Sequence, residues 1–358
     1  MKVIFSTSAL VLLASTALAQ TFNIANYPPV NAVPPVNSPQ MTEWLKDINL
    51  ADVPKLALHP GNPPAPCPLP ATIPADQCWW TCQQCLGTDY DRCPNAGDWG
   101  ITFDDGPTPN TIPLLATLKA NNVKATFFVM GSNVVRNAPI LKQEYDEGHH
   151  IASHTWSHFP LTSLSNEQIV AEVKWTEKAV FEITGLRMKY IRPPYGDIDN
   201  RVRSVISKLG YRVVDWTDDA ADSKDFALNA KYTEATLAAG VNTMATHLTT
   251  WGANPANKGI ITLEHDLYNV TVTFAKLLLD ATKQAKLKPM TVAQCLGDNS
   301  PYQTGTTVPM VPGGGENKPN GTNTANPNGP VVKSQGSRMS HTTGVAIASI
   351  LAFAVLAF

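Results

Sequence analysis

The chain has 358 residues, of which 43% are hydrophobic, and its formal net charge is −2. Because 27 basic residues are balanced by 29 acidic ones, the sequence offers no strong basic field for nucleic acid or for an acidic polymer. We therefore expect a neutral substrate and no nucleic-acid partner, and the sequence implies no protein partner.

Residues 1–19 are predicted to be a secretory signal peptide. Lys2 precedes an apolar run over 3–13, and Ala-Leu-Ala at 17–19 forms a cleavage site. The run is shorter than the ~20 residues that a membrane-spanning helix needs. Cleavage is therefore favoured over a membrane anchor, and the mature chain would begin near Gln20.

Residues 20–96 are predicted to form an irregular Pro- and Cys-rich arm packed on the main domain, with a short helix near 41–48. The chain has six cysteines, which suits an oxidising compartment and up to three disulfides. The candidates are Cys67, Cys78, Cys82, Cys85, Cys93 and Cys295.

Five of these cysteines lie in the arm, so at least one must pair outside it if all six are bonded. Cys295 is the remaining partner, and the rest of the connectivity stays open. The Cys-Gln-Gln-Cys segment at 82–85 is compatible with a redox pair or half a zinc site. The sequence has no second Cys-x-x-Cys, which favours a structural role.

Residues 97–297 alternate between strand-like and helix-like segments, which predicts one α/β domain of parallel strands and crossover helices. Expected strands span 99–103, 123–130, 189–191, 212–216 and 260–263, and residues 151–152 lead into a histidine pair. Expected helices run from an Asn110 cap to 120, over 134–147, from a Ser165–Gln168 capping box to 183, over 201–209 and over 270–285.

The polar motifs of this domain follow its expected strands. Chemistry at the carboxyl ends of strands is typical of a (β/α) barrel. The weak pattern over 218–258 predicts a distorted barrel and not a regular eightfold one.

Two adjacent carboxylates, Asp104 and Asp105, are followed along the chain by His154 and His158. One carboxylate and two imidazoles make a set of three ligands that leaves a divalent metal open positions for water and substrate. The second carboxylate is then placed to accept a proton from that water. Together, at strand ends, these residues predict a metal-dependent hydrolase.

The motifs of polysaccharide deacetylases appear in their usual order as Thr-Phe-Asp-Asp-Gly-Pro (102–107), His-Thr-Trp-Ser-His (154–158), Arg-Pro-Pro-Tyr-Gly (192–196) and Leu-Glu-His (263–265). The sequence thus resembles the NodB-homology domain of carbohydrate esterase family 4 over 97–297. It is most similar to fungal chitin deacetylases with a glycosylphosphatidylinositol (GPI) anchor. The resemblance implies a distorted (β/α) barrel with one divalent metal, zinc or cobalt, held by Asp105, His154 and His158.

The resemblance also implies catalytic roles. Asp104 would be the general base, and His265 the general acid that protonates the departing amine, a poor leaving group. Leu263 would form the apolar pocket for the acetyl methyl group. Arg192 would orient the base and wall one side of the groove, and the backbone N–H of Tyr195 would complete an oxyanion site.

The sequence departs from the family at one further motif, which aligns with residues 216–223, between the Arg-Pro-Pro-Tyr-Gly and Leu-Glu-His motifs. Asp219 and Asp222 match its acidic positions and are candidates for orienting His265. Ser223 stands where the family has tryptophan, so the stacking surface for a sugar would come from another ring. The candidates are Trp216, Trp251, Trp79 and Trp80, with a packing role favoured for Trp79 and Trp80.

Residues 298–343, rich in Pro, Gly, Asn, Thr and Ser, are predicted to be a flexible stalk. The uncharged run 344–358 has the character of a GPI-anchor signal that is removed on maturation, with Ser334 as candidate attachment residue. Asn269 and Asn320 begin glycosylation sequons. We expect secretion to the cell surface and a GPI lipid anchor at the plasma membrane, the cell wall or both.

The resulting hypothesis is a metal-dependent hydrolase that removes N-acetyl groups from chitin, a β-1,4-linked N-acetylglucosamine polymer, to give chitosan and acetate. One alternative keeps the fold and acts as an O-acetyl esterase on xylan or another wall polysaccharide. The other is a non-catalytic, wall-anchored glycan-binding protein, against which the complete set of acids and histidines argues.

Overall fold

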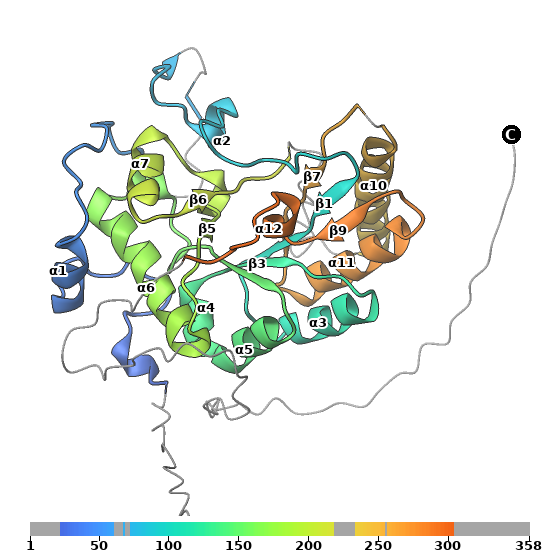
Figure 1. Ribbon diagram of the computed structural model, residues 1–358, viewed down its shortest axis with the longest axis horizontal. Helices are drawn as coiled ribbons and strands as arrows, with labels where there is room; N and C mark the ends of the chain where they lie inside the picture. Colours follow the sequence, from blue (N-terminus) through green and yellow to red (C-terminus); the bar gives the residue numbers. More distant parts are fainter. Residues whose placement is uncertain (1–21, 61–66, 69–71, 218–232, 255, 304–358) are drawn as a thin grey trace, which may run out of the picture.

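Two sheets of parallel strands lie at the centre of the computed structural model, which describes residues 22–60, 67–68, 72–217, 233–254 and 256–303 (Figure 1). The larger sheet has the order β6-β5-β4-β3-β2-β8, and the smaller one the order β7-β1-β9. Every pair of neighbouring strands in them is parallel. The strands are β1 Asp98–Gly100, β2 Thr102–Asp104, β3 Thr126–Val129, β4 His150–Ser153, β5 Tyr190–Ile191, β6 Arg212–Val213, β7 Ile260–Ile261, β8 Glu264–His265 and β9 Lys288–Met290.

The segment expected as one strand over 99–103 is two strands that belong to different sheets. Ile101 separates them: its N–H donates to the carbonyl of Met290 in β9 (3.1 Å), while its own carbonyl accepts from the N–H of Thr126 in β3 (3.0 Å). The backbone therefore exchanges hydrogen-bond partners at a single residue and passes from the smaller sheet into the larger one.

A second link joins the outer edges of the two sheets. Just after β6, the N–H of Thr217 donates to the carbonyl of Ile261 in β7 (3.0 Å). Parallel strands with helices around them, connected in this way, confirm the predicted distorted (β/α) barrel.

Most of the helices lie around the strands (Figure 1). Their bounds are α1 Pro39–Leu45, α2 Trp80–Gln83, α3 Thr111–Ala120, α4 Gly131–Arg136, α5 Ala138–Asp146, α6 Asn166–Thr184, α7 Asn200–Lys208, α10 Glu234–Ala253, α11 Asn269–Thr282 and α12 Val292–Cys295, with short 3₁₀ turns at η1 Ile24–Asn26, η3 Leu161–Ser163 and η4 Pro194–Gly196. The capping box of α6 is confirmed, because Ser165 Oγ accepts from the Gln168 N–H and the Gln168 side chain accepts from the Ser165 N–H. Asn110 is not a side-chain cap; its amide donates to the carbonyl of Leu267 instead (2.8 Å).

Two helical segments differ from expectation. The helix expected over 134–147 is broken into α4 and α5 at Asn137, and Pro139 follows at once. Proline has no N–H to continue the ladder of the preceding helix. In the weakly patterned stretch, α10 was not predicted; it packs on α11 through buried side chains such as Leu237, Met244 and Leu248.

Both ends of the described chain are packed on the barrel. Met41 and Trp44 of α1 are buried, and the Trp44 ring meets the Trp175 ring edge to face at 5.1 Å. Past the predicted end of the domain at 297, the hydroxyl of Tyr302 accepts from the N–H of Ile151 (3.2 Å), and Lys189 Nζ lies 2.5 Å from Asp298. Within the described ranges, no helix has the length and apolar character needed to cross a membrane.

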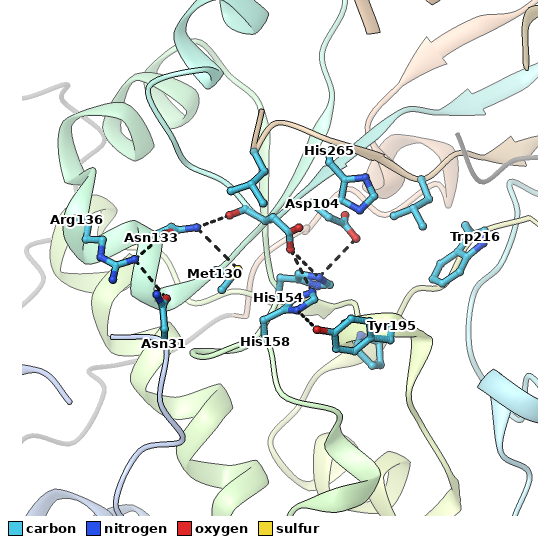
Figure 2. A pocket seen from close by; sticks show the side chains of 14 residues that line it. Asn31, Asp104, Met130, Asn133, Arg136, His154, His158, Tyr195, Trp216 and His265 are labelled. Carbon is cyan, nitrogen blue, oxygen red and sulfur yellow. Dashed lines mark hydrogen bonds and ion pairs between the residues drawn. The ribbon is translucent and has the colours of Figure 1, made fainter. Parts of the chain in front are cut away.

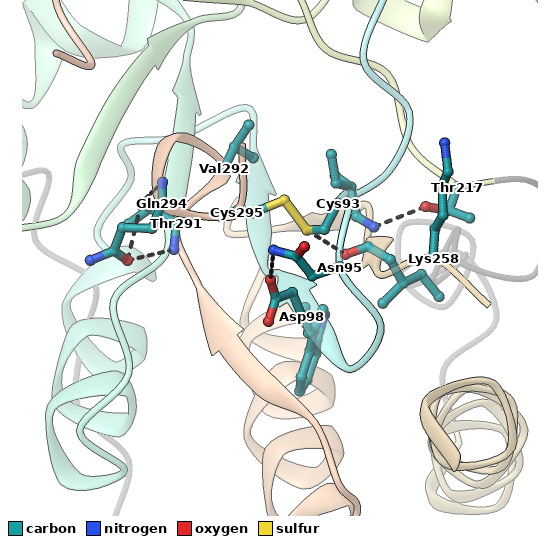
Figure 3. Close-up of a disulfide and its surroundings, with 12 residues drawn as sticks. Cys93, Asn95, Asp98, Thr217, Lys258, Thr291, Val292, Gln294 and Cys295 are labelled. Carbon is teal, nitrogen blue, oxygen red and sulfur yellow. Dashed lines mark hydrogen bonds between the residues drawn. A yellow bond between two sulfur atoms is a disulfide. The ribbon is translucent and has the colours of Figure 1, made fainter. Parts of the chain in front are cut away.

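The six cysteines form three disulfides: Cys67–Cys82, Cys78–Cys85 and Cys93–Cys295. The expectation that one arm cysteine pairs with Cys295 is thus confirmed. Since the cysteines of the Cys-x-x-Cys segment bond to different partners, that segment is neither a redox pair nor half a zinc site. Cys93 and Cys295 are buried beside β1, where their bond joins the start of the barrel to α12 (Figure 3).

The Cys93–Cys295 bond closes a segment with a sequence separation of 202. Replacing both residues with alanine should lower the free energy of unfolding by about 2–5 kcal/mol, because so long a loop restricts the unfolded chain strongly. Urea unfolding of the otherwise oxidised protein measures this. The matched control replaces Cys78 and Cys85 with alanine. Because their bond closes a sequence separation of only 7, the free energy of unfolding should fall by less. A larger fall in the control than in the Cys93/Cys295 variant would contradict the prediction.

Candidate active site

A cavity of about 760 Å³ opens where several strands of the larger sheet end (Figure 2). It is lined by Asn31, Asp104, Asp105, Met130, Asn133, Arg136, His154, His158, Pro193, Tyr195, Trp216, Leu263, His265 and Leu267. The sequence-predicted acids and histidines therefore face one shared space.

The strands explain this convergence. Asp104 ends β2 and Asp105 follows it, while His154 follows β4. His265 ends β8 and is the Cα partner of Asp104 in the neighbouring parallel strand. Since parallel strands end at the same edge of a sheet, side chains far apart in sequence meet at the carboxyl ends.

Asp105, His154 and His158 form a compact set of potential metal donors, with donor atoms within 4.8 Å of one another. Asp105 Oδ1 lies 3.5 Å from His154 Nε2 and 3.2 Å from His158 Nε2. This oxygen is buried and makes no hydrogen bond with any described residue. A buried carboxylate oxygen without a hydrogen bond, facing two imidazole nitrogens, fits a divalent cation well.

The protonation states of the two imidazoles also suit metal binding. Burial, helped by nearby His158, lowers the pKa of His154 to about 3. Burial likewise lowers the pKa of His158, although Asp105 opposes the shift. Both rings are therefore neutral near pH 7, the form that binds a metal.

Hydrogen bonds to the opposite ring nitrogens fix how the imidazoles point. His154 Nδ1 lies 2.8 Å from the carbonyl of Arg192, and His158 Nδ1 lies 3.0 Å from the hydroxyl of Tyr195. A backbone carbonyl can only accept, so His154 carries its proton on Nδ1 and leaves Nε2 open toward Asp105. Such contacts orient metal-binding histidines in proteins.

The two adjacent carboxylates differ in their affinity for a proton. Burial acts to raise the pKa of Asp105, but the surrounding imidazoles outweigh it and hold that pKa below its ordinary value. For Asp104, burial dominates and raises the pKa to about 6, although Arg192 and then His265 pull it down. Asp104 is thus mostly ionised at neutral pH while keeping appreciable affinity for a proton.

Arg192 is fully buried behind Asp104. Its Nη1 donates to Asp104 Oδ1 (2.8 Å) and to Thr102 Oγ1 (2.7 Å), and Nη2 donates to the carbonyl of Asp215 (2.9 Å). The orientation of Asp104 by Arg192 agrees with the resemblance. The further expectation that Arg192 walls the groove is wrong, because its side chain has no exposed surface and does not line the cavity.

The walls of the cavity include the other implied residues and one of the candidate rings. Leu263 lines it with little exposure, and Tyr195 lines it with its ring against His158. Trp216 also faces the cavity and is held from behind by Trp80 at 4.4 Å. Trp79 and Trp80 are buried packing residues, and Trp251 does not line the cavity.

Several site residues have a left-handed backbone that costs L-amino acids energy. The φ angles are 76° at Asp105, 67° at Thr155, 62° at His158 and 61° at Tyr195. Such conformations persist only where the surrounding structure enforces them, and they gather at functional sites. Here they turn the chain after the strands, and the side chains of Asp105, His158 and Tyr195 line the cavity.

Glu172 of α6 holds the loop between the two metal-facing histidines. Its buried carboxylate accepts hydrogen bonds from the N–H groups of Trp156 (2.7 Å) and Ser157 (2.8 Å), and from the hydroxyl of Ser157. Burial raises the pKa of Glu172 to about 7, although these hydrogen bonds act against the shift. The capping box of α6 was predicted from the sequence, but the role of Glu172 at the site was not.

We expect Glu172→Ala to destabilise the protein by about 1–3 kcal/mol for each buried N–H left unsatisfied, and to weaken metal binding because the loop loses its support. Thermal unfolding and zinc titration measure the two effects. Glu172→Gln is the matched control, since it keeps an acceptor and is neutral like the protonated acid. Equal metal affinity in the alanine variant and the wild type would contradict the prediction.

The remaining sequence-based site residues fall into two groups. Asn269 is exposed at the start of α11, which is compatible with the predicted glycosylation. Asp219, Asp222, Asn320 and Ser334 lie outside the described residues, as do the predicted signal peptide, most of the predicted stalk and the C-terminal run.

Sequence reasoning missed part of the cavity lining. Asn31 comes from the arm, and Asn133 and Arg136 come from α4. An asparagine in a Pro-rich arm carries no motif, so only the folded chain could reveal its position.

The fold and the donor set together define a class: distorted (β/α) barrels with a site for one divalent metal at the strand ends. The sequence pattern of the family Polysaccharide deacetylase matches residues 91–214. Chitin deacetylase 1 of Saccharomyces cerevisiae is 38% identical over 269 residues, covering 72% of this chain and 81% of that relative. The chain belongs to the polysaccharide deacetylase family.

Similarity to two further proteins supports this membership. Chitin deacetylase 1 of Cryptococcus neoformans var. grubii is 38% identical over 289 residues, which are 77% of this chain but only 60% of that longer relative. The solved structure of the chitin deacetylase from Colletotrichum lindemuthianum shares 30% sequence identity, with a TM-score of 0.57 over 62% of this chain and 98% of that chain.

Proposed function

We propose that this protein is a metal-dependent chitin deacetylase, which hydrolyses the N-acetyl groups of β-1,4-linked N-acetylglucosamine polymers to give chitosan and acetate. The main support for this proposal is that the Asp105–His154–His158 set, Asp104 and His265 all line one cavity. The names of the fungal relatives favour chitin among acetylated glycans.

The proposed metal is one Zn²⁺ or Co²⁺ ion, held by Asp105, His154 and His158. When bound, it would supply Lewis acidity, which polarises an acyl oxygen and makes water easier to deprotonate. The neutral imidazoles and the ionised Asp105 are already in the protonation states that such an ion requires.

Asp104 is the proposed general base, which takes a proton from the attacking water. Its bond to buried Arg192 fixes one carboxylate oxygen, so the other, Oδ2, is directed toward His154 at 3.8 Å. This arrangement supports proton transfer at Oδ2, beside the metal-binding set.

His265 is the proposed general acid, which donates a proton to the amine as the C–N bond breaks. It stands beside Asp104 in the neighbouring strand and faces the same cavity (Figure 2). Leu263, two residues earlier, offers an apolar surface for the acetyl methyl group. The backbone N–H of Tyr195 is the proposed donor to the oxyanion, and Asp219 or Asp222 the proposed partner that orients His265.

We also propose that the protein is secreted and held at the cell surface. The signal-peptide pattern at 1–19, the stalk-like composition of 298–343, Ser334 and the apolar run 344–358 support secretion and a GPI anchor at the membrane or in the wall. Sequons at Asn269 and Asn320 support glycosylation.

Acetate release tests the substrate. The zinc-loaded protein is incubated with N-acetylglucosamine oligomers and, in parallel, with acetylated xylan. We expect acetate and free amines from the oligomers and little acetate from xylan. Reaction with xylan alone would replace the proposal with O-acetyl esterase activity, and no reaction with either would favour a non-catalytic glycan-binding protein.

A further inference from the structure

One end of the active-site cavity is polar and is built partly by the N-terminal arm. Asn31 and Arg136 line this end, while Trp216 lines the cavity on the other side of the acids and histidines (Figure 2). The family match begins at residue 91, so Asn31 lies outside it.

Hydrogen bonds place this part of the arm against the metal-site loop. The N–H of Asn31 donates to Ser132 Oγ (2.9 Å), whose hydroxyl donates to the carbonyl of Trp156 (2.6 Å). The indole N–H of Trp156 in turn donates to the carbonyl of Pro29 (3.1 Å), and its ring stacks on Tyr27 at 5.8 Å. The arm is therefore a fixed part of the cavity wall.

Arg136 supplies unused hydrogen-bond donors at this end. Its Nη1 reaches Asn31 Oδ1 (3.3 Å) and Asn133 Oδ1 (3.4 Å), and no other side-chain nitrogen of Arg136 bonds to a described residue. The side chain is exposed to the cavity and the solvent. A guanidinium has five N–H donors, so most of them remain available for hydroxyl or acetamide oxygens.

We propose that Asn31 and Arg136 form a sugar-binding subsite, which takes a neutral N-acetylated unit of the polymer next to the unit that reacts. This rests on the proposed function, because a linear polymer lying across the reacting groups must extend past them. The positive charge of Arg136 favours a neutral acetylated unit over a protonated glucosamine unit, whose ammonium group it repels. The subsite therefore selects polymers in which the sugar unit next to the reacting one is acetylated.

The test compares Asn31→Gly and Arg136→Gln with the wild type on N-acetylglucosamine dimer and pentamer. Glycine suits the φ of 59° at position 31, so the substitution removes the side chain without straining the backbone. The ratio of kcat/KM on pentamer to kcat/KM on dimer should fall about 3- to 10-fold, the effect of one or two lost hydrogen bonds. Asn26→Ala, an exposed residue of the same arm outside the cavity, should leave the ratio unchanged.

A second readout separates recognition from a structural effect. At a pH where the free amine is protonated, the wild type should prefer fully acetylated pentamer to partly deacetylated pentamer, and Arg136→Gln should lose much of that preference. Unchanged length ratios and unchanged preference in both variants would overturn the subsite.

Binding measurements distinguish a failure of the subsite from a failure of the proposed function. If the wild type releases no acetate, the proposed function fails, and calorimetric titration with pentamer then tests the subsite alone. Weaker pentamer binding by Asn31→Gly and Arg136→Gln would support the subsite. Equal binding by all proteins, or no binding by the wild type, would overturn it.

Discussion

Asp104→Asn should lower kcat by about 10²–10⁴-fold, because asparagine cannot accept the proton that the attacking water must lose. The substitution keeps the shape of the side chain, and Arg192 can still donate to the amide oxygen. Metal content should remain as in the wild type, since Asp105 and the two histidines are unchanged. Acetate release from a chitin oligomer and metal analysis of the same sample measure both quantities.

The matched control for this variant is Asp47→Asn, an exposed aspartate beyond the end of α1. It should retain wild-type kcat and metal content. Asp104→Asn with wild-type kcat would show that another group takes the proton. Loss of metal in that variant would instead assign Asp104 to the metal site.

Removal of the metal or of one of its ligands should have a comparably large effect. A chelator should abolish acetate release, and added Zn²⁺ or Co²⁺ should restore it, because the Asp105–His154–His158 set leaves open positions for the reacting groups. His158→Ala should lower both bound metal and activity. Its side chain is 21% exposed, so the variant loses less core packing than one at His154.

His247→Ala is the control for the ligand variant, because His247 lies on α10 and does not line the cavity. It should keep metal and activity. Thermal unfolding of each metal-free variant separates loss of the ligand from loss of the fold. Full activity of the metal-free wild type would contradict the assignment of this site.

A helix or strand could be predicted where residues close together in the sequence indicate it. The α6 capping box was predictable because Ser165 and Gln168 form it within one helical turn. The helix α10 was not, because its alanines and threonines give no clear apolar stripe; its burial depends on contact with α11. The division of residues 99–103 between two sheets was equally hidden, since Ile101 changes partners only when β9 and β3 are both in place.

The candidate site divides in the same way. The motif residues Asp104, Asp105, His154 and His158 could be read from the sequence because their chemistry lies in residue type and spacing. The burial of Arg192 and the support of the loop by Glu172 could not, because each depends on which elements pack behind the site.

By itself, the sequence determined the class of chemistry, since a carboxylate pair and a histidine pair at strand ends suffice to indicate a metal-dependent hydrolase. Only the tertiary structure decided which side chains surround the polymer. Asn31 reaches the cavity because the arm is held by Trp156 and Ser132, contacts between residues about a hundred positions apart that no local pattern records. Reacting groups are specified by motif, whereas the groove around them is specified by packing.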